Sequence, residues 1–305
     1  MTNIGRRAFI TLIGGAAAAW PIATRAQQPD RMRRIGVLTP FAADDPESMA
    51  RVAAFLQALG NLGWTVGRHV QIDYRWSAID ADRTRKDATE LVALAPDVIL
   101  ATGTPVTAAL LQATRTVPIV FAQVPDPVAT GFVASLAQPG GNVTGFSTFD
   151  YATSVKWLEL LKEIAPRVKL AAVLRDPTIA SGMGQLAAIL GVASAFGVEL
   201  RPVGVRDAGE IERTVTAFAR EPNGGLIVPA SPLSIVQRDL IITLAARHRL
   251  PAVYSLRFFV TSGGLISYGP DTIEPYRRAP RTLTASSRAR NRPTCPCRRR
   301  PSTSW

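Results

Sequence analysis

The sequence predicts an α/β protein of two similar lobes, each a parallel β-sheet with helices on both faces. Segments of strand and helix character alternate along the chain, and most expected strands are uninterrupted apolar runs. The alternation restarts once, near residues 143–153. Continuous apolar strands separated by helices are typical of parallel sheets that are buried on both faces. A chain of 305 residues is long enough for two such lobes.

The clearest unit is a β-α-β segment in the first third of the chain. Asp97–Ala101 and Ile119–Gln123 are short apolar runs of strand character. Between them, Pro105 suits the first turn of a helix, and apolar residues then recur at helical spacing. We expect a right-handed crossover between the two strands, because parallel pairs are connected in this way.

Two loops follow these strands and form one half of a predicted binding cleft. They are Thr102–Thr104, which precedes the helix, and Pro125–Pro127. In parallel sheets, such loops lie over helix amino termini, where free N–H groups and the positive end of the helix dipole attract ligands.

The other elements of the first lobe follow from the same patterns. In the first helix, Val52, Phe55, Leu56 and Leu59 are expected on the buried face. Alternation of apolar and polar residues predicts an edge strand at His69–Arg75. The remaining strands are expected at Arg34–Thr39 and Val143–Ser147, and the helices at Glu47–Leu62, Asp80–Leu94 and Val128–Leu136.

The second lobe repeats the alternation with nine further elements, and another helix begins at Asp271. Strands are expected at Leu170–Arg175, Val198–Val203, Gly225–Pro229, Ala252–Ser255 and Gly264–Tyr268, and helices at Thr153–Ile164, Ala180–Phe196, Ala208–Ala219 and Leu233–Arg247.

The positive charge is concentrated at the two ends of the chain. Of the net charge of +12, three charges lie in residues 1–26 and seven in residues 280–305, which leaves +2 for residues 27–279. A nearly neutral body argues against nucleic-acid binding. Both cysteines, Cys295 and Cys297, lie in the basic tail, so the body has neither disulfides nor thiolate metal sites.

Residues 1–26 have the pattern of a twin-arginine signal peptide. Arg6 and Arg7 precede an apolar segment, Ile13–Trp20, that is too short to span a bilayer. Small residues at positions 24–26 place the expected cleavage before Gln27. The alternative is an uncleaved anchor, and in either case we expect a periplasmic protein with no later transmembrane segment.

Motifs for most kinds of catalysis are absent from the sequence. His69 and His248 are the only histidines, and neither has a neighbour at metal-ligand spacing. There is no Gly-x-Ser-x-Gly elbow and no Walker lysine. The glycine-rich segment 140–145 precedes a strand, so a turn is the better interpretation than a dinucleotide loop. We therefore expect no metal, no cofactor and no enzymatic activity.

The candidate ligand-binding residues are uncharged or acidic side chains near the carboxyl ends of strands. Ser and Thr hydroxyls and loop N–H groups suit a carboxylate, aspartates suit an amine, and tyrosines stack on apolar groups. Each residue can also be explained by a purely structural role, such as forming a turn or capping a helix. The candidates are Thr39, Thr102, Gly103, Thr104, Asp126, Asp176, Ser231, Tyr254, Tyr268 and Asp271.

Several of these motifs, in this order and spacing, resemble the substrate-binding proteins of ABC importers, in particular the tryptophan/tyrosine-type family. The resemblance covers roughly residues 1–279. It implies a type I periplasmic-binding fold, with two Rossmann-like lobes joined by a three-strand hinge, and a permease and an ATPase as partners. The motifs are the leader through Ala26, Ile35–Pro40, the Ala101–Pro105 loop, Pro125–Pro127, Gln138–Gly145, Lys156–Leu161 and Gly264–Asp271.

These patterns together predict four regions. Residues 1–26 are the signal, 27–145 with 267–279 form the first lobe, and 146–266 form the second. Residues 280–305 are rich in Arg, Ser, Thr and Pro and lack regular periodicity, which predicts a disordered basic tail. This tail is either an interaction arm or the product of a shifted reading frame. In the second case a helix and a strand of the family's first lobe are missing and folding is impaired; sequencing the gene distinguishes the two.

The resemblance favours a periplasmic receptor that binds a small solute, such as an amino acid or related organic acid, and delivers it to a permease. Two other functions stay open. One is an extracytoplasmic sensor of a signalling system, and the other is an envelope enzyme on an α/β fold, for which the sequence offers no nucleophile and base.

Overall fold

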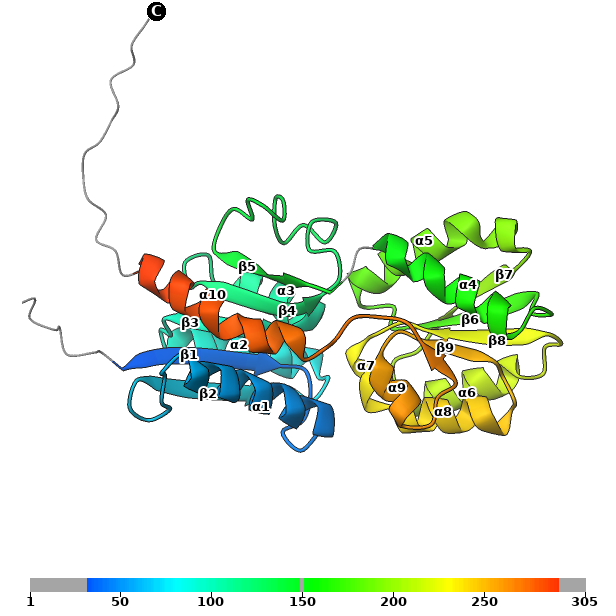
Figure 1. The fold of residues 1–305 in the computed structure, drawn as a ribbon, viewed down its shortest axis with the longest axis horizontal. Helices are drawn as coiled ribbons and strands as arrows, with labels where there is room; N and C mark the ends of the chain where they lie inside the picture. The colour runs from blue at the N-terminus through cyan, green and yellow to red at the C-terminus, as the bar shows by residue number, and fades with distance from the viewer. Residues whose placement is uncertain (1–31, 149–150, 291–305) are drawn as a thin grey trace, which may run out of the picture.

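The computed structural model describes residues 32–148 and 151–290, which form two lobes side by side (Figure 1). Each lobe contains a five-stranded sheet in which every strand pairing is parallel. The predicted fold class, two α/β lobes with parallel sheets, is confirmed. The predicted signal peptide lies outside the described residues.

The first lobe has two helices on each face of its sheet. Its elements are β1 (Arg33–Thr39), α1 (Pro46–Asn61), β2 (Val70–Trp76), α2 (Ala81–Ala93), β3 (Val98–Thr102), α3 (Gly103–Ala113), β4 (Ile119–Val124), β5 (Val143–Ser147) and α10 (Glu274–Arg290). The strand order is β2-β1-β3-β4-β5, with β2 at the predicted edge. Alternate residues of β1 point to opposite faces. Ile35 and Val37 pack with α1 and α10, whereas Leu38 packs with α2 and α3.

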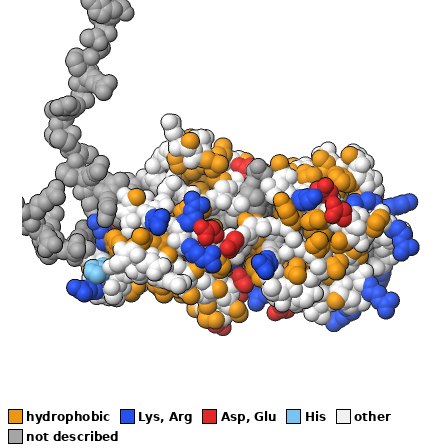
Figure 2. Space-filling view, viewed as in Figure 1, with side chains coloured by type: hydrophobic (Ala, Val, Ile, Leu, Met, Phe, Trp, Pro, Cys, Tyr) orange, Lys and Arg blue, Asp and Glu red, His pale blue; other side chains and the backbone are white. Residues whose placement is uncertain are grey.

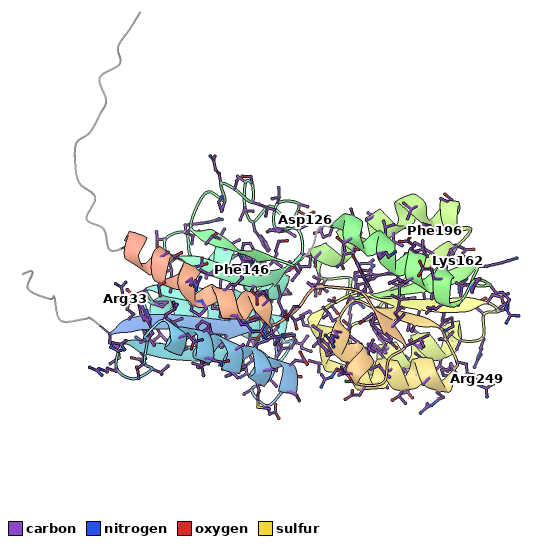
Figure 3. The ribbon with its side chains drawn as sticks, in the orientation of Figure 1. Arg33, Asp126, Phe146, Lys162, Phe196 and Arg249 are labelled. Atoms are coloured by element: carbon purple, nitrogen blue, oxygen red, sulfur yellow. The ribbon has the colours of Figure 1, made fainter. Side chains whose placement is uncertain are left out.

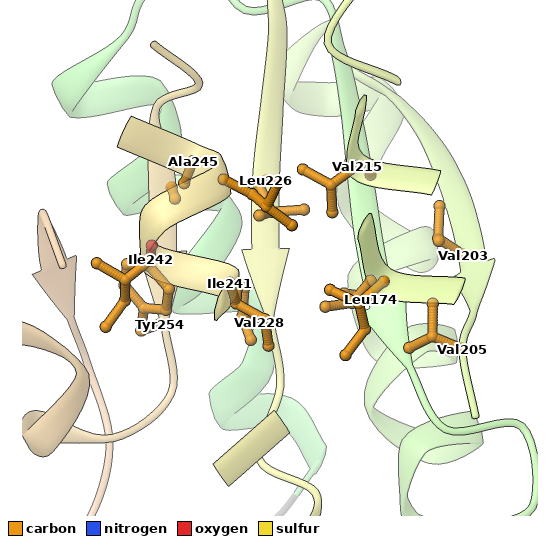
Figure 4. Close-up of a cluster of buried hydrophobic side chains, with 14 of the residues drawn as sticks. Leu174, Val203, Val205, Val215, Leu226, Val228, Ile241, Ile242, Ala245 and Tyr254 are labelled. Carbon is orange, nitrogen blue, oxygen red and sulfur yellow. The ribbon is translucent and has the colours of Figure 1, made fainter. Parts of the chain in front are cut away.

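The second lobe repeats this layering with the strand order β10-β9-β8-β6-β7. Helices α4 and α5 cover one face, and α6, α7 and α8 cover the other, where Leu226 and Val228 of β8 lie in the core (Figure 4). Its elements are η1 (Tyr151–Ser154), α4 (Val155–Ile164), β6 (Leu170–Arg175), α5 (Ala180–Ala193), η2 (Ser194–Phe196), β7 (Glu199–Gly204), α6 (Ala208–Phe218), β8 (Gly224–Val228), α7 (Pro232–Val236), α8 (Arg238–Arg247), β9 (Ala252–Tyr254), α9 (Arg257–Thr261) and β10 (Ile266–Ser267).

Two of the four residues predicted on the buried face of α1, Phe55 and Leu59, are buried, and the rest of the buried stripe differs from the prediction. Its buried residues are Ser48, Arg51, Phe55 and Leu59, whereas Leu56 is 37 % exposed. Both stripes have helical spacing, so periodicity alone does not distinguish them. The methylene stem of an arginine packs like an apolar side chain, which lets Arg51 occupy a position that the sequence pattern gave to an apolar residue.

Two of the predicted helices differ in the structure. Residues 128–136 form turns instead of a helix. The Asp126 carboxylate accepts a hydrogen bond from the Ala129 N–H, and Gly131 then adopts a positive φ of 74°, which is incompatible with helix propagation. The predicted helix 233–247 is divided into α7 and α8 at Gln237, and the short helix α9 was not predicted.

Helix α10 continues well past the predicted start of the disordered tail. It runs to Arg290 with Pro280 inside it. Tyr276, Ala279 and Leu283 recur at helical spacing and are buried in the core of the first lobe, against the same face as α1. An interior proline costs about 3 kcal/mol or more, because it removes one helical N–H bond and its ring crowds the carbonyl four residues earlier, and burial of this stripe offsets that loss. The prediction of disorder from Pro280 is therefore wrong over residues 280–290, and residues 291–305 lie outside the described part.

Within residues 32–290 the chain connects the lobes twice, the first time through residues 149–150, which lie outside the described part. It passes from β5 to η1, and it returns from β10 to α10 (Figure 1). The family resemblance implies a third connection, which the described residues do not contain. Because β10 pairs with β9, Ser267 belongs to the second sheet, one residue beyond the predicted boundary between the lobes. Among the described helices, none has the length and apolar character needed to cross a bilayer.

Candidate functional site

A cleft between the lobes is lined by residues that follow the carboxyl ends of strands in both sheets. The first lobe contributes loops after β1, β3, β4 and β5, and the second contributes loops after β6, β8, β9 and β10. In α/β sheets this edge is where ligands are bound. The first-lobe lining is Pro40, Phe41, Thr102, Gly103, Thr104, Pro105, Gln123, Pro125 and Thr148, and the second-lobe lining is Ile179, Ser181, Ala230, Ser231, Pro232, Ile235, Leu256, Pro270 and Thr272.

The cleft consists of two adjoining spaces. The inner cavity has a volume of about 50 Å³, and the outer one, between the amino ends of α2 and α3 and the loop after β6, has about 360 Å³. They share Pro40, Thr104, Pro105, Ile179 and Pro232. Ligand pockets for small molecules usually measure about 300–1,000 Å³. The inner cavity alone is too small for an amino acid, but the two spaces together are within the usual range.

Four predicted residues come together around the inner cavity, and a fifth lines the outer one. Thr102, Gly103 and Thr104 lie at the amino end of α3, opposite Ser231 of the second lobe. Asp176 follows β6 and lines the outer cavity.

The amino end of α3 leaves polar groups available to a ligand. Thr102 precedes the helix without capping it, because its Oγ1 lies 2.9 Å from the Tyr276 hydroxyl instead. The Thr104 hydroxyl is buried and has no hydrogen-bond partner. Gly103 has a φ of +79°, a backbone conformation that glycine adopts without strain. Free N–H groups at a helix amino end and an unpartnered hydroxyl suit a negatively charged or carbonyl oxygen.

Ser231 and Asp176 are already engaged in local structure. Ser231 forms a capping box with Ser234 at the start of α7, in which its hydroxyl accepts the Ser234 N–H at 3.0 Å. The Asp176 Oδ1 accepts hydrogen bonds from the Thr178 N–H and hydroxyl at 2.8 and 2.6 Å. Both side chains are therefore held in fixed positions next to the cleft.

The other five predicted residues do not line these two cavities. Thr39 is buried beneath the cleft, where its hydroxyl accepts the Phe41 N–H at 3.5 Å. Asp126 lies at the end of the first lobe that faces the second lobe, where its carboxylate organises the turn after β4 (Figure 3). Tyr254 is buried in the core of the second lobe (Figure 4). It stacks on Phe259, with ring centroids 4.9 Å apart.

Tyr268 and Asp271 belong to the segment that returns to the first lobe. The Tyr268 side chain is 44 % exposed, and its backbone carbonyl accepts the Trp157 indole N–H at 2.7 Å. The Asp271 carboxylate accepts the N–H groups of Ile273 and Glu274, and these bonds, the one from Ile273 foremost, lower its pKa. The role of all ten residues as ligand contacts remains a prediction.

Several cleft residues were not predicted from the sequence. Phe41, Gln123, Thr148 and Ser181 line the inner cavity. Gln123 and Thr148 are polar residues near the carboxyl ends of strands, which is the criterion by which Thr102 was predicted. Gln123 also has a positive φ of 59°. Phe41 carried no such signal, because an aromatic residue after a strand is usually a core residue. The Thr148 hydroxyl, like that of Thr104, is buried without a hydrogen-bond partner.

The described lining of the inner cavity carries no charged side chain. The outer cavity has one of each sign, Arg85 and Asp176. Across the lobes, Arg238 Nη1 lies 3.5 Å from Asp45 Oδ2, and both side chains are largely buried. On the face seen in Figure 2, acidic and basic side chains lie next to one another where the two lobes meet. Among the described residues, no three His, Cys, Asp or Glu side chains are grouped as metal ligands.

Solved structures with the same two-lobe architecture include two bacterial proteins. A conserved domain protein of Vibrio cholerae aligns with a TM-score of 0.77 at 25 % identity, covering 83 % of this chain and 84 % of that one. An ABC domain from Streptococcus pneumoniae in complex with L-Trp aligns with a TM-score of 0.76 at 24 % identity and the same coverage. The predicted type I periplasmic-binding fold is thereby confirmed.

Sequence comparison identifies the family. The chain is 30 % identical over 217 residues to the tyrosine-binding protein of Clostridioides difficile, an alignment that covers 71 % of this chain and 62 % of that protein. The chain thus spans less than two thirds of the length of this relative. The model of the family described as ABC transporter substrate binding protein matches residues 35–279. The chain therefore belongs to the ABC transporter substrate binding protein family.

Proposed function

We propose that this protein is the periplasmic solute-binding component of an ABC importer and holds one small solute between its lobes. The observation that carries the proposal is the cleft itself, in which strand ends of both lobes meet around the buried, unpartnered hydroxyls of Thr104 and Thr148. Buried polar groups without partners are rare in proteins, and a bound solute would supply the missing hydrogen bonds.

In the proposed mechanism the solute stabilises the closed arrangement of the lobes. The amino end of α3 contacts it from the first lobe, and Ser181 and Ser231 contact it from the second. A ligand that touches both lobes shifts the equilibrium toward the closed state by its additional contacts there. The closed form then docks on a membrane permease, and an associated ATPase drives transport. Export by the twin-arginine segment of residues 1–26 would place the protein outside the cytoplasm.

The proposed solute class is an amino acid or a related organic acid. Two proteins similar to this chain are described as a tyrosine-binding protein and as a complex with L-Trp. The cleft combines hydroxyl groups with apolar walls formed by Phe41, Ile179 and Leu256, a combination that suits a solute with one polar end and one apolar end.

A thermal-shift screen of amino acids and small aromatic acids, followed by calorimetry on each stabilising compound, tests this proposal. Thr104→Val keeps the side-chain shape but removes the unpartnered hydroxyl, and we expect roughly tenfold weaker solute binding, as for the loss of one hydrogen bond. Thr89→Val, the same change at an exposed threonine of α2, is the matched control and should leave affinity unchanged. A screen in which no compound raises the melting temperature, or equal affinities of the two variants, would contradict the proposal.

A further inference from the structure

Arg51 is a buried cation without a hydrogen-bonding partner. It lies on the inner face of α1 and is 2 % exposed. All three guanidinium nitrogens are buried and none has a hydrogen-bond partner. A buried guanidinium is costly unless its N–H groups and its charge are satisfied.

The contacts that Arg51 does make satisfy it only in part. Its guanidinium lies over the Phe41 ring, 4.7 Å from the centroid. The nearest carboxylate is that of Glu47, one turn earlier on α1, with Glu47 Oε2 at 3.8 Å from Arg51 Nη2 and partly exposed to solvent. That separation is an ion pair beyond hydrogen-bond distance. The stacking and the ion pair reduce the electrostatic cost, but five N–H donors remain unused.

The space beside Arg51 is lined by hydroxyl groups. The hydroxyl-bearing residues of the lining are Thr39, Ser48, Tyr74, Thr102 and Tyr276, and the rest of it is formed by Arg51 itself and apolar residues of β1, β3 and α1. Thr102 and Tyr276 are hydrogen-bonded to each other, at 2.9 Å. Hydroxyl donors around a single guanidinium make an environment that favours an anion.

This space shares a lining residue with the cleft. Thr102 lines both the inner cavity of the cleft and the space beside Arg51, and the Phe41 ring on which the guanidinium stacks also lines the inner cavity. The free volume beside Arg51 is about 10 Å³. That is room for one water-sized group, such as one oxygen of a carboxylate, that of formate or of a larger acid, or a halide ion.

We propose that Arg51 binds a small monovalent anion at the floor of the cleft, either the carboxylate of the solute or a free anion such as formate or chloride. The first source rests on the proposed function and narrows it, because the transported solute is then a carboxylate. The second source does not depend on solute binding. In both cases Arg51 acquires the hydrogen bonds that it lacks in this structure.

The first arm of the test uses free anions on the whole protein. Sodium formate and sodium chloride are titrated against sodium gluconate at equal ionic strength, because gluconate is too large for this space, and the melting temperature is recorded. We expect stabilisation by formate or chloride over gluconate if the anion is free. Arg51→Met should abolish that difference, and Arg247→Met, the same change at an exposed arginine of α8, should retain it.

The second arm uses solute pairs that differ only in the carboxylate. L-tryptophan, L-tyrosine and benzoate are compared with tryptophanamide, tyrosinamide and benzamide by calorimetry. If the solute supplies the anion, the acid binds roughly tenfold or more tightly than its amide in the unsubstituted protein, and Arg51→Met removes that preference. Arg51→Lys, which keeps the charge, should retain part of it.

The outcomes separate this proposal from the proposed function. A formate effect that depends on Arg51, without binding of any solute, supports the anion site and counts against solute transport. Acids and amides that bind equally, with no effect of formate or chloride, support solute binding and overturn the anion site. Without anions, Arg51→Met should change the melting temperature little, because methionine keeps the apolar stem, and the desolvation cost of the guanidinium is lost together with its contacts to Phe41 and Glu47. A lower melting temperature together with an unchanged anion response would show a purely structural arginine.

Discussion

At the scale of single residues, burial makes stability depend on pH in the alkaline range. Tyr254 is 1 % exposed in the core of the second lobe, and this desolvation raises its pKa to about 12. The unfolded chain has the ordinary tyrosine pKa of about 10. The phenol therefore ionises more readily in the unfolded state, so its contribution to stability is complete below about pH 10 and is lost as the pH rises toward 12.

Tyr254→Phe tests this account of alkaline unfolding. Phenylalanine keeps the ring stacked on Phe259 but cannot ionise. When the pH is raised from about 9 to about 11.5, the free energy of unfolding should therefore fall by about 2 kcal/mol less in the variant than in the unsubstituted protein. Urea denaturation at the two pH values measures the difference. Tyr268→Phe, at an exposed tyrosine, controls for the loss of a hydroxyl group. Identical pH slopes for Tyr254→Phe and the unsubstituted protein would refute the account.

The roles of several single residues in the site could not be predicted from the sequence. Asp126, Asp176 and Asp271 all follow strands, and sequence gave no means to separate a ligand-binding aspartate from one that organises a turn or caps a helix. In the structure each accepts backbone N–H bonds nearby. The opposite error concerns Arg51, which sequence would place in solvent because arginines are rarely buried. A hydrogen-bonding group without a partner can be recognised only when the residues around it in the folded protein are known.

At the scale of elements, helix α10 shows how packing overrides local sequence preference. Pro280 and the surrounding Ser and Thr residues are unfavourable for a helix interior, whereas the arginines favour one. Nevertheless Tyr276, Ala279 and Leu283 place one apolar stripe against β3, β4 and α1. The strands were easier to predict, because buried parallel strands are continuous apolar runs and their ends are set by polar or glycine residues.

Leu283→Ala tests whether the helix beyond Pro280 contributes to the first lobe. Leu283 is 1 % exposed, so the truncation should leave a cavity and cost about 2–5 kcal/mol in the free energy of unfolding. Arg281→Ala, on the exposed side of the same turn, should change it by less than about 0.5 kcal/mol. Urea denaturation measures both. Equal midpoints for the two variants would mean that the segment after Pro280 does not pack on the lobe, as the prediction of a disordered tail required.

At the scale of the whole molecule, the lobes are held together by more than their two connections. Phe41 follows β1 of the first lobe, yet it is 2 % exposed and belongs to the hydrophobic core of the second lobe. Near it, Asp45 caps α1 and forms an ion pair with Arg238 at the start of α8. Sequence predicted the two lobes and the edges that face each other, but contacts between lobes depend on their relative orientation, which local patterns do not encode.

Phe41→Ala should weaken the contact between the lobes without unfolding either of them. Burial of a phenylalanine contributes about 1.5–3 kcal/mol, so its loss should open the molecule and weaken solute binding by roughly tenfold or more. Small-angle X-ray scattering should then give a larger radius of gyration for the variant. Phe196→Ala is the control, because Phe196 lies on the second lobe near the end of α5 (Figure 3). That change should lower stability but alter neither the radius of gyration nor affinity. If Phe41→Ala keeps both values as well, the lobes are held closed by the chain connections and the Asp45–Arg238 pair instead of by the aromatic contact.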